Sequence, residues 1–400
     1  MSLYGTMRTG VSGMNAQANR LGTVGDNIAN SSTVGYKKSS TQFSSMLLPS
    51  SGSSYNSGGV ETTVRYSIND QGSFTYTTSA TDLAIDGDGF FVVQGSDGTE
   101  YMTRSGNFEE MDDGTLQNSA GYTLMGYPYS STEDPTIVIN GFEGLVPINI
   151  DSGGLNATPS TEGVVEGNLN ANAAIASSYK ASVVAFDSQG NSRPLDLNYT
   201  KTAANSWDLT ISYTDSVGTT TTLGTDTLTF GADGKLTSGG TVTTTPLTID
   251  GAELGAVDLD FTKTTQLGSA SSVEGDIDGQ GASGVDRVEI SKDGIVSVIY
   301  GNGQSIPTYR IAMATVQSPN NLTPMAGNVY SQSNDSGVVV MGYSGTSGYG
   351  DILSNALEDS NVDIAEELTA MIESQRNYTA NSKVFQTGSE LLETLVNLKR

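Results

Sequence analysis

Carboxylates are the most numerous side chains of this chain that could do chemistry. The sequence holds 44 Asp and Glu residues against 18 Lys and Arg, and it holds neither Cys nor His. Without Cys and His it has no thiolate nucleophile, no imidazole base, no disulfide and none of the usual zinc ligand sets. Any acid–base chemistry would depend on carboxylates, and no pair of them is singled out for glycoside hydrolysis.

In two short segments, acidic residues alternate with other residues, a spacing that a cation site can use. Residues 86–89 are Asp-Gly-Asp-Gly, and Glu274, Asp276 and Asp278 alternate ahead of a glycine. A calcium loop of the EF-hand type spreads its ligands over about twelve residues and closes on Glu. Neither run closes in that way, and the first leads into an apolar segment. We therefore favour a turn for the first run and a solvated strand edge or linker for the second.

Signatures of other binding and catalytic classes are missing from the sequence. It contains no Gly-x-Ser-x-Gly elbow and no phosphate-binding loop. The formal net charge of −26 and the pI near 4.1 argue against nucleic acid and against anionic membrane surfaces. We predict a protein with no catalytic residue, no metal site and no cofactor.

Both ends of the chain are predicted helices, at residues 3–30 and 360–398. Apolar or small residues recur at steps of three and four in each, which keeps one seam facing a partner helix. The first helix also carries Gly5, Gly10, Gly13, Gly22 and Gly25, each of which costs about 1 kcal/mol relative to Ala. An ordinary core helix with a ragged face is one interpretation. We favour the other, a segment that becomes ordered when partners surround it.

The second helix is apolar over much of its girth, so it needs neighbours on more than one side. We predict that the seams of both helices carry self-assembly, through Val11, Met14, Leu21, Ile28, Leu368, Met371, Tyr378, Phe385 and Leu392. No window reaches about 18 uninterrupted apolar residues, so we expect no membrane-spanning helix. Residues 1–20 lack an apolar run of about 7–15 residues, so we expect no cleaved signal peptide.

The middle of the chain has strand-like alternation broken by Gly-containing turns, such as those at residues 97–98 and 112–114. Between 148 and 275 the composition shifts to Thr, Ser, Asn and Gly, which is typical of a small antiparallel β domain inserted into the first. The predicted fold is mixed but mainly β, with terminal helices pairing as a coiled-coil-like core and two outer antiparallel β domains. The expected divisions are a helical domain (1–35 and 357–400), linkers (36–70 and 346–356), an inner β domain (71–147 and 276–345) and an inserted outer β domain (148–275).

Several segments, in the order in which they occur, resemble the axial proteins of the bacterial flagellum, the rod and hook proteins. The matching segments are residues 26–36, 85–93, 103–108, 121–127, 294–304, 356–363 and 367–381. Segment 107–114 is more acidic than the usual pattern. Rod proteins of this family are shorter and lack most of residues 148–275, whereas residues 186–191 and 199–207 are similar to the outer domain of hook proteins. The resemblance therefore indicates the hook proteins.

This resemblance implies a structural subunit that polymerises into a flexible curved tube and transmits torque from rod to filament as a universal joint. It implies as partners further copies of the chain, the distal rod protein, the hook cap and hook–filament junction proteins. It also implies secretion by the flagellar type III export apparatus to an extracellular hook. Two alternatives stay open: a distal rod subunit of the basal body, or a secreted surface-binding β protein whose helices serve as a stalk.

Overall fold

The computed structural model describes residues 3–46, 58–130, 135–151, 154–346 and 348–398. Within it the chain divides into two compact units. The first comprises residues 1–152, 288–298 and 306–400, and the second comprises residues 153–287 and 299–305. Residues 47–57 of the predicted linker 36–70 lie outside the described residues, as do Lys399 and Arg400.

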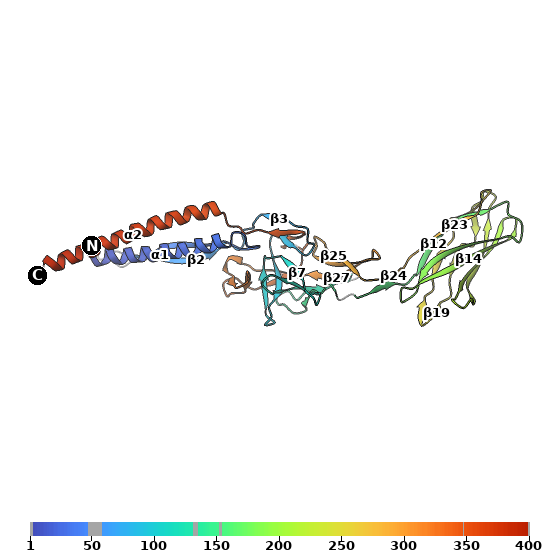
Figure 1. The fold of residues 1–400 in the computed structure, drawn as a ribbon, viewed down its shortest axis with the longest axis horizontal. Helices are drawn as coiled ribbons and strands as arrows, with labels where there is room; N and C mark the ends of the chain where they lie inside the picture. Colours follow the sequence, from blue (N-terminus) through green and yellow to red (C-terminus); the bar gives the residue numbers. More distant parts are fainter. Residues whose placement is uncertain (1–2, 47–57, 131–134, 152–153, 347, 399–400) are drawn as a thin grey trace. The chain divides into compact units, whose positions relative to one another are not determined.

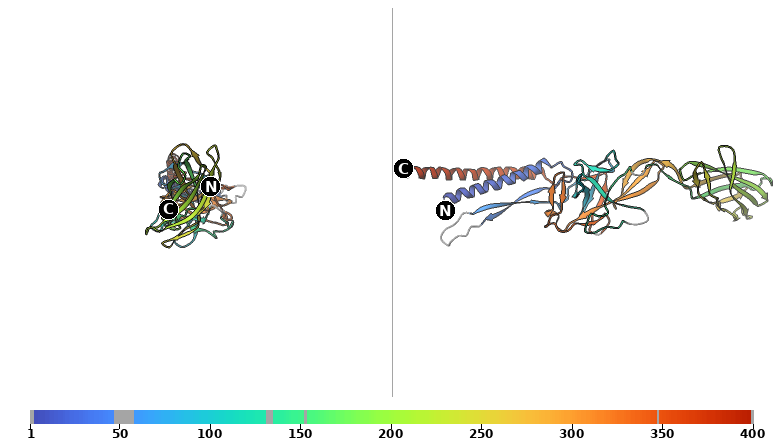
Figure 2. Two further views of the ribbon diagram at one scale, coloured as in Figure 1. Left: turned by 90° about the vertical axis from the view of Figure 1, so that its right-hand side faces the viewer. Right: turned by 90° about the horizontal axis from the view of Figure 1, so that it is seen from below.

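Both ends of the chain form long helices, which belong to the first unit. They are α1 (Leu3–Ala29) and α2 (Ile364–Leu398), and they lie side by side (Figures 1 and 2). The side chain of Asp363 caps α2 by accepting hydrogen bonds from the backbone N–H groups of Ala365 and Glu366. Glu366 and Glu367 in the first turn also suit the positive end of the helix dipole. The prediction of a helix at each end is confirmed.

The remaining elements of the first unit are strands and one short 3₁₀ helix, and three of the strands (β25, β26 and β27) begin or end in the second unit. They are β1 (Ser39–Met46), β2 (Gly59–Tyr66), β3 (Phe74–Tyr76), β4 (Leu83–Asp86), β5 (Phe90–Gln94), β6 (Glu100–Thr103), β7 (Phe108–Glu110), β8 (Leu116–Asn118), β9 (Thr123–Pro128), β10 (Val146–Pro147), β25 (Val285–Ile290), β26 (Ile295–Tyr300), β27 (Ser305–Ile311), β28 (Met313–Thr315), η1 (Pro319–Asn321), β29 (Thr323–Met325), β30 (Val329–Ser331), β31 (Val340–Gly342), β32 (Asp351–Ser354) and β33 (Ala356–Glu358). The largest sheet has the order β25-β26-β27-β9-β5-β6-β30-β29.

Strand β5 is at the centre of this sheet and is buried on both faces. Phe91 and Val93 pack into one apolar cluster, and Phe90 and Val92 pack into another. A strand with a core on each side needs an unbroken apolar run instead of alternation, which explains the sequence Phe-Phe-Val-Val. The Asp-Gly-Asp-Gly run ahead of it is a turn between β4 and β5, as predicted, with Gly87 and Gly89 at φ of 115° and 125°.

Both segments that the sequence predicted as linkers contain strands. In residues 36–70, β1 and β2 pair as an antiparallel hairpin. In residues 346–356, β32 pairs with β4 and buries Ile352 completely. The first was missed because β1 is rich in Ser and the apolar positions of β2 are few, and the second because a Gly/Ser run precedes it. Local composition did not reveal partners that lie far away in the sequence.

The second unit is built from two main sheets around one apolar core. Its strands are β11 (Asn156–Thr158), β12 (Glu162–Asn170), β13 (Ser178–Phe186), β14 (Ser192–Ala203), β15 (Ser206–Thr214), β16 (Thr220–Phe230), β17 (Leu236–Ser238), β18 (Thr241–Thr243), β19 (Leu247–Ile249), β20 (Ala252–Leu254), β21 (Asp258–Asp260), β22 (Thr264–Leu267), β23 (Ser272–Ile277) and β24 (Gln280–Ser283). Strands β13 to β17 form an antiparallel sheet. On β15, Trp207, Leu209 and Ile211 face the core in strict alternation.

The other sheet of this unit is mixed. Strand β12 runs parallel to β21 and β22 and antiparallel to β23. The prediction of an antiparallel domain therefore describes the sheet of β13 to β17 but not this one, because pairing direction is set by how distant strands meet and leaves little trace in local alternation. Among the described residues, neither helix is long and apolar enough to cross a membrane.

Asp187 makes the stability of the second unit depend on pH. Burial raises the pKa of its carboxyl, but hydrogen bonds from Asn191 and Arg193 outweigh burial and hold the pKa below its usual value. A lowered folded-state pKa adds stability above the unfolded value of about 3.9, and that stability is lost as pH falls through the folded value.

We therefore expect Asp187→Asn to lower the urea midpoint of the second unit clearly at pH 7 and only slightly at about pH 2–3, where the wild-type carboxyl is also protonated. The fluorescence of Trp207, which is the only Trp of the chain and is buried in this unit, measures the transition. An equal loss of stability at both pH values would contradict the role given to the ionised carboxylate.

Candidate assembly interface

Glycines let α1 and α2 approach closely. A Cβ atom on Gly13 would lie 2.7 Å from the side chain of Asn381, and one on Gly10 would lie 3.3 Å from the Asn381 carbonyl oxygen. On α2, a Cβ atom on Gly388 would lie 2.7 Å from the side chain of Met7. The helices are therefore antiparallel, and the early glycines of α1 are used for packing.

The face of α2 that meets α1 follows steps of three and four. Its most buried positions are Glu367, Ser374 and Gly388, and Met371 and Phe385 between them are half-buried. Small or polar residues of α2 thus occupy the positions that lie closest to α1. The Oγ atom of Ser374 is buried without a hydrogen-bond partner among the described residues. This contact is close but it buries little apolar surface.

The structure places the predicted assembly residues at two levels of burial. Half-buried beside the partner helix or the hairpin are Met14, Leu21, Ile28, Met371, Phe385 and Leu392. Exposed are Val11, Leu368 and Tyr378, at 37%, 46% and 42% of their surface. The seam predicted for α2 is therefore not all directed at α1. Within one chain the side carrying Ser374 and Gly388 faces α1, because it allows the closest approach.

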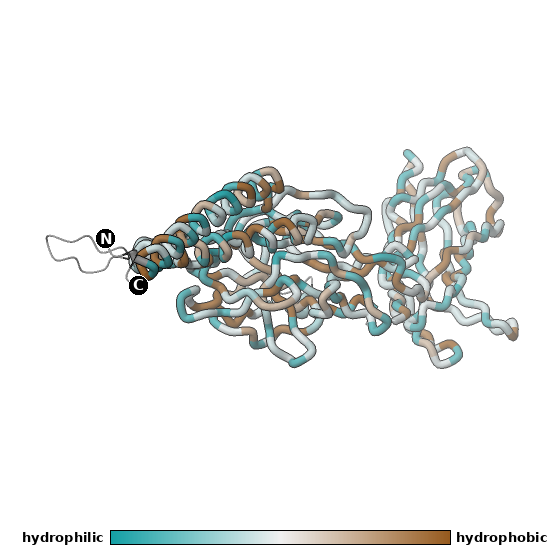
Figure 3. The backbone as a smooth tube through the Cα atoms, turned by 60° about the vertical axis from the view of Figure 1, so that its left-hand side comes forward, coloured by the Kyte–Doolittle hydropathy of each residue, from teal (hydrophilic) through white to brown (hydrophobic). Residues whose placement is uncertain are grey.

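Apolar residues are left exposed along both helices. Figure 3 shows hydrophobic segments distributed along the helix pair and interleaved with hydrophilic ones. The exposed large apolar residues of α2 are Ile364, Leu368, Ile372, Tyr378, Val384, Leu391, Leu395 and Val396. The β clusters of both units are, by contrast, almost completely buried. Exposed large apolar residues also occur on the hairpin and on the strands and loops of both units, but α2 carries eight of them within 35 residues.

The β1–β2 hairpin lies against α1 through polar contacts (Figure 2). The Ser12 hydroxyl donates to the Val60 carbonyl at 3.0 Å and accepts from the Val60 N–H at 2.8 Å. Further along, the Asn19 amide donates to the Thr62 hydroxyl at 2.8 Å. These hydrogen bonds add to apolar packing at Val60, which lines one pocket with Met7 and Val11 of α1.

A cluster of buried charges joins the base of the helices to the inner sheets. We define the buried charge cluster as Lys37, Arg104 and Glu358. The Glu358 carboxylate is fully buried and lies 2.5 Å from Lys37 Nζ and 3.3 Å from Arg104 Nη1. It also accepts the backbone N–H of Gly72 at 2.9 Å. Burial lowers the pKa of both Lys37 and Arg104, and the Glu358 carboxylate opposes that shift.

The segment after α1 is fixed by side-chain bonds to backbone. The Asn27 side chain is buried, donates to the Ser39 carbonyl at 2.8 Å and accepts from the Ser39 N–H at 3.0 Å. Gly35 has a φ of 66°, and a Cβ atom there would lie 2.6 Å from the backbone of Arg104. Asn27 is thus a specific contact, whereas Asn30 closes the helix by donating to the Asp26 carbonyl.

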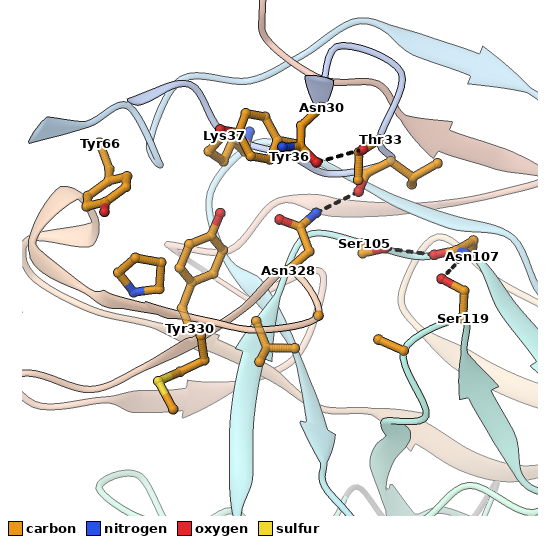
Figure 4. Close-up of a pocket in the computed structure, with 16 residues that line it drawn as sticks. Asn30, Thr33, Tyr36, Lys37, Tyr66, Ser105, Asn107, Ser119, Asn328 and Tyr330 are labelled. Carbon is orange, nitrogen blue, oxygen red and sulfur yellow. Dashed lines mark hydrogen bonds between the residues drawn. The ribbon is translucent and has the colours of Figure 1, made fainter. Parts of the chain in front are cut away.

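A pocket of about 530 Å³ lies beside this segment in the first unit (Figure 4). Asn328 reaches across it and donates to the Val34 carbonyl at 2.7 Å. On the other side Ser105 donates to Asn107, which donates to Ser119. Several of its polar groups thus bind one another or nearby backbone.

Among the described residues, no three acidic side chains come together as a metal site. In the second predicted acidic run, Asp278 accepts hydrogen bonds from Thr161 and from the N–H of Glu162. It therefore ties β12 to the end of β23. The buried charge cluster was not predicted from the sequence, because Lys37 stands next to Lys38 and no local signal marks it as the buried one of the two.

Comparison with known proteins places four families along the chain. "Flagella basal body rod protein" matches residues 7–37, and "Flagellar hook protein FlgE/F/G D1 domain" matches residues 84–167. "Flagellar basal body protein FlaE D2 domain" matches residues 149–279, and "Flagellar basal body rod FlgEFG protein C-terminal" matches residues 353–398. These matches include most of α1, all of α2 and most of the second unit.

Full-length relatives carry a single description. The flagellar hook protein FlgE of Rhizobium meliloti (strain 1021) is 58% identical, with 100% of both chains covered. That of Brucella suis biovar 1 is 47% identical over 100% of both, and that of Salmonella typhimurium (strain LT2) is 33% identical over 97% of this chain and 98% of its own. A crystal structure of the Helicobacter pylori flagellar hook protein FlgE2 aligns at 15% identity with a TM-score of 0.49, covering 70% of this chain and 98% of that one.

We expect Gly13→Leu to loosen the helix pair and Gly22→Leu to leave it intact. Leu at position 13 would collide with Asn381, whereas the structure describes no atom within 4 Å of a Cβ at position 22. Overpacking of this kind costs about 1–3 kcal/mol, while Gly→Leu otherwise favours a helix. Circular dichroism at 222 nm during heating should separate the two variants. Equal melting curves would argue against close packing at Gly13.

Removing the anion of the buried charge cluster should destabilise the first unit. Glu358→Ala leaves Lys37 and Arg104 buried without their counter-charge, a loss of about 3–5 kcal/mol. We expect the calorimetric transition of the first unit to move to lower temperature while the Trp207 transition of the second unit stays in place. Glu166→Ala, which removes an exposed ion pair with Lys263, is the control. A calorimetric transition unmoved by Glu358→Ala would contradict the account.

Proposed function

The chain belongs to the family of flagellar hook proteins FlgE, and from this membership we propose how its helices build a polymer. It is a structural subunit of the bacterial flagellar hook. We propose that it has no catalytic activity and that α1 and α2 stack with those of neighbouring copies to form the inner wall of a tube.

The observation that carries this proposal is the exposed apolar surface of the helix pair. In one chain α1 and α2 touch through Gly13, Ser374 and Gly388, while bulkier residues such as Leu368 and Ile372 face outward. Burying apolar surface is favourable by about 25 cal/mol per Å². Copies that packed these faces together would gain that stabilisation, which a single chain cannot obtain.

The proposed mechanical role depends on two kinds of contact between copies, firm contacts between helices and weak contacts between β domains. We propose that the helices provide cohesion, while the β domains on the outside of the tube slide past those of neighbours as the hook bends and transmits torque. Polar surfaces suit such exchange, because water-mediated contacts can be replaced at small cost. The net charge of −26 keeps such surfaces soluble.

The hook assembles within the flagellum, and its further partners are part of the proposal. We propose that the ends of the tube meet the distal rod protein, the hook cap and hook–filament junction proteins. We also propose export through the flagellar type III apparatus without a cleaved signal peptide. The division into helical, inner β and outer β domains remains a working description of how these roles are separated.

The two alternative functions are not favoured. A distal rod subunit would lack most of the segment that matches the FlaE D2 domain at residues 149–279. A secreted surface-binding β protein would not require relatives named as hook proteins to match from end to end. We therefore pursue neither one further.

We expect Leu368→Asp to prevent tube formation while both units stay folded. Leu368 is exposed in the single chain, so a charge there costs little until a neighbour buries it, when the cost is at least about 1–3 kcal/mol per contact. Met371 is less suitable for this test, because it is half-buried beside α1 and a charge there would also disturb the single chain. Sedimentation and electron microscopy measure the polymer, and circular dichroism and Trp207 fluorescence measure the fold.

Thr369→Asp is the matched control, since it adds the same charge one position away on an exposed, polar residue. If both substitutions block assembly equally, added negative charge alone explains the effect. Normal tubes from Leu368→Asp would refute the assignment of this residue to the assembly surface.

A further inference from the structure

Asn is followed directly by Gly at two places in the sequence, residues 140–141 and 302–303. The side chain of such an Asn can react with the backbone of its own chain. Glycine has no Cβ atom to obstruct the approach of its nitrogen to the side-chain amide carbon. Both pairs have this same local chemistry, but the structure places them in different surroundings.

The pair at 302–303 is held by hydrogen bonds on each polar group that takes part in the reaction. It lies between β26 and β27. The Asn302 amide donates to the Gly281 carbonyl at 3.0 Å, and its oxygen accepts from the Gln304 N–H at 3.0 Å. The Gly303 N–H, which carries the nitrogen that would attack, donates to the Tyr300 carbonyl at 2.8 Å. Reaction here requires that these hydrogen bonds break first.

The pair at 140–141 lies on the surface of the first unit, between β9 and β10. The Ile139 carbonyl accepts from the Met341 N–H at 2.9 Å, so the chain is anchored beside β31 immediately before Asn140. Asn140 itself is exposed, and in the part of the chain that the structure describes its side chain makes no hydrogen bond. A Cβ atom on Gly141 would meet only Val138 within 4 Å, at 3.9 Å. Both the amide and its surroundings are therefore open.

We propose that Asn140 is a deamidation site, at which the chain is modified without an enzyme. The Gly141 nitrogen loses its proton to hydroxide and bonds to Cγ of Asn140. The bond from Cγ to Nδ2 breaks, and the departing nitrogen takes a proton from water and leaves as ammonia. The product is a cyclic imide, a succinimide, which water then opens.

The direction of ring opening determines the final residue. Water that adds at Cγ gives Asp, and water that adds at the Asn140 backbone carbonyl carbon gives isoaspartate. The net reaction consumes one water molecule and releases one ammonia molecule, and no atom is oxidised or reduced. The chain and water supply everything that the reaction needs, so the inference is independent of the proposed function.

Deamidation would change the surface on which it occurs. A neutral amide becomes a carboxylate, and isoaspartate also lengthens the main chain by a methylene group. Exposed apolar residues lie in the same segment and in the strand beside it: Val138, Ile139 and Val340, at 42%, 61% and 39% of their surface. A carboxylate next to them raises the free-energy cost of burying this surface against another molecule.

The test follows both pairs in one sample. We would incubate the purified full chain at mildly alkaline pH in water enriched in heavy oxygen, and then digest it in ordinary water. Mass spectrometry measures the labelled acid form of each Asn-Gly peptide, and only conversion before digestion carries the label. Because hydrogen bonds restrain Asn302, we expect Asn140 to convert at least about tenfold faster, a difference of about 1.4 kcal/mol in the barrier.

The unfolded chain is the matched control, because there both sites keep their Asn-Gly sequence without the hydrogen bonds of the fold. In concentrated guanidinium chloride we expect the two rates to approach each other. Gly141→Ala, for which the structure has room, puts a Cβ atom on the attacking residue and should slow conversion at Asn140 alone. Circular dichroism and Trp207 fluorescence measure whether the chain stays folded during the native incubation.

The outcomes either support or overturn the site. Faster conversion of Asn140 in the folded chain, with the difference lost on unfolding, supports it. Equal rates in the folded chain, or a faster reaction at Asn302, overturn the assignment of Asn140 as the reactive position. An Asn140 that stays unmodified in the folded chain, while both sites convert in the unfolded chain, overturns it as well.

Discussion

The rest of the structure depends on the packing of α1 against α2, which covers only part of their apolar surface. Their contact relies on small residues, since Gly13 and Gly388 bring the two backbones close together. A close contact of this kind sets the register of the helices but buries little apolar surface. Leu368, Ile372 and Leu395 remain outside it. Under the proposed function, neighbouring copies cover these residues, and assembly completes the packing of the helices.

The buried charge cluster explains how force on the helices can reach the sheets. Glu358 ends β33 just before α2, and Lys37 lies between α1 and β1. Their ion pair links the bases of both helices, and Arg104 ties them to the sheet that contains β6. An ion pair is a costly way to stabilise a core, but it fixes one geometry because any displacement leaves charges unpaired. A joint that carries torque needs a defined attachment at this point.

Part of this structure could be predicted from sequence, where the signal is local. Steps of three and four predicted both helices, and the Asp-Gly-Asp-Gly turn and the strand after it were recognisable from neighbouring residues. Features made by distant residues were missed. Lys37 and Glu358 are 321 positions apart, and the hairpin of β1 and β2 is bonded to Ser12 and Asn19 of α1.

The orientation of α2 also depends on distant residues and could not be predicted from local sequence. Apolar spacing predicted a seam through Leu368 and Tyr378, but in the single chain the side with Ser374 and Gly388 faces α1. Periodicity identifies apolar positions and cannot say which of several partners each one meets. The contact within one chain uses the side of α2 that carries small residues, and the side that carries larger apolar residues stays exposed. The assembly residues named from the sequence therefore stay a prediction about the polymer.

Electron microscopy of the purified chain, beside a form lacking residues 1–29 and 364–400, tests this account most directly. The shortened form keeps Lys37 and Glu358 but has neither helix. The account predicts curved tubes from the full chain as salt and concentration are raised, and only folded monomers from the shortened form. Tubes from the shortened form, with the same diameter and at the same concentration, would contradict the claim that the helices hold the polymer together.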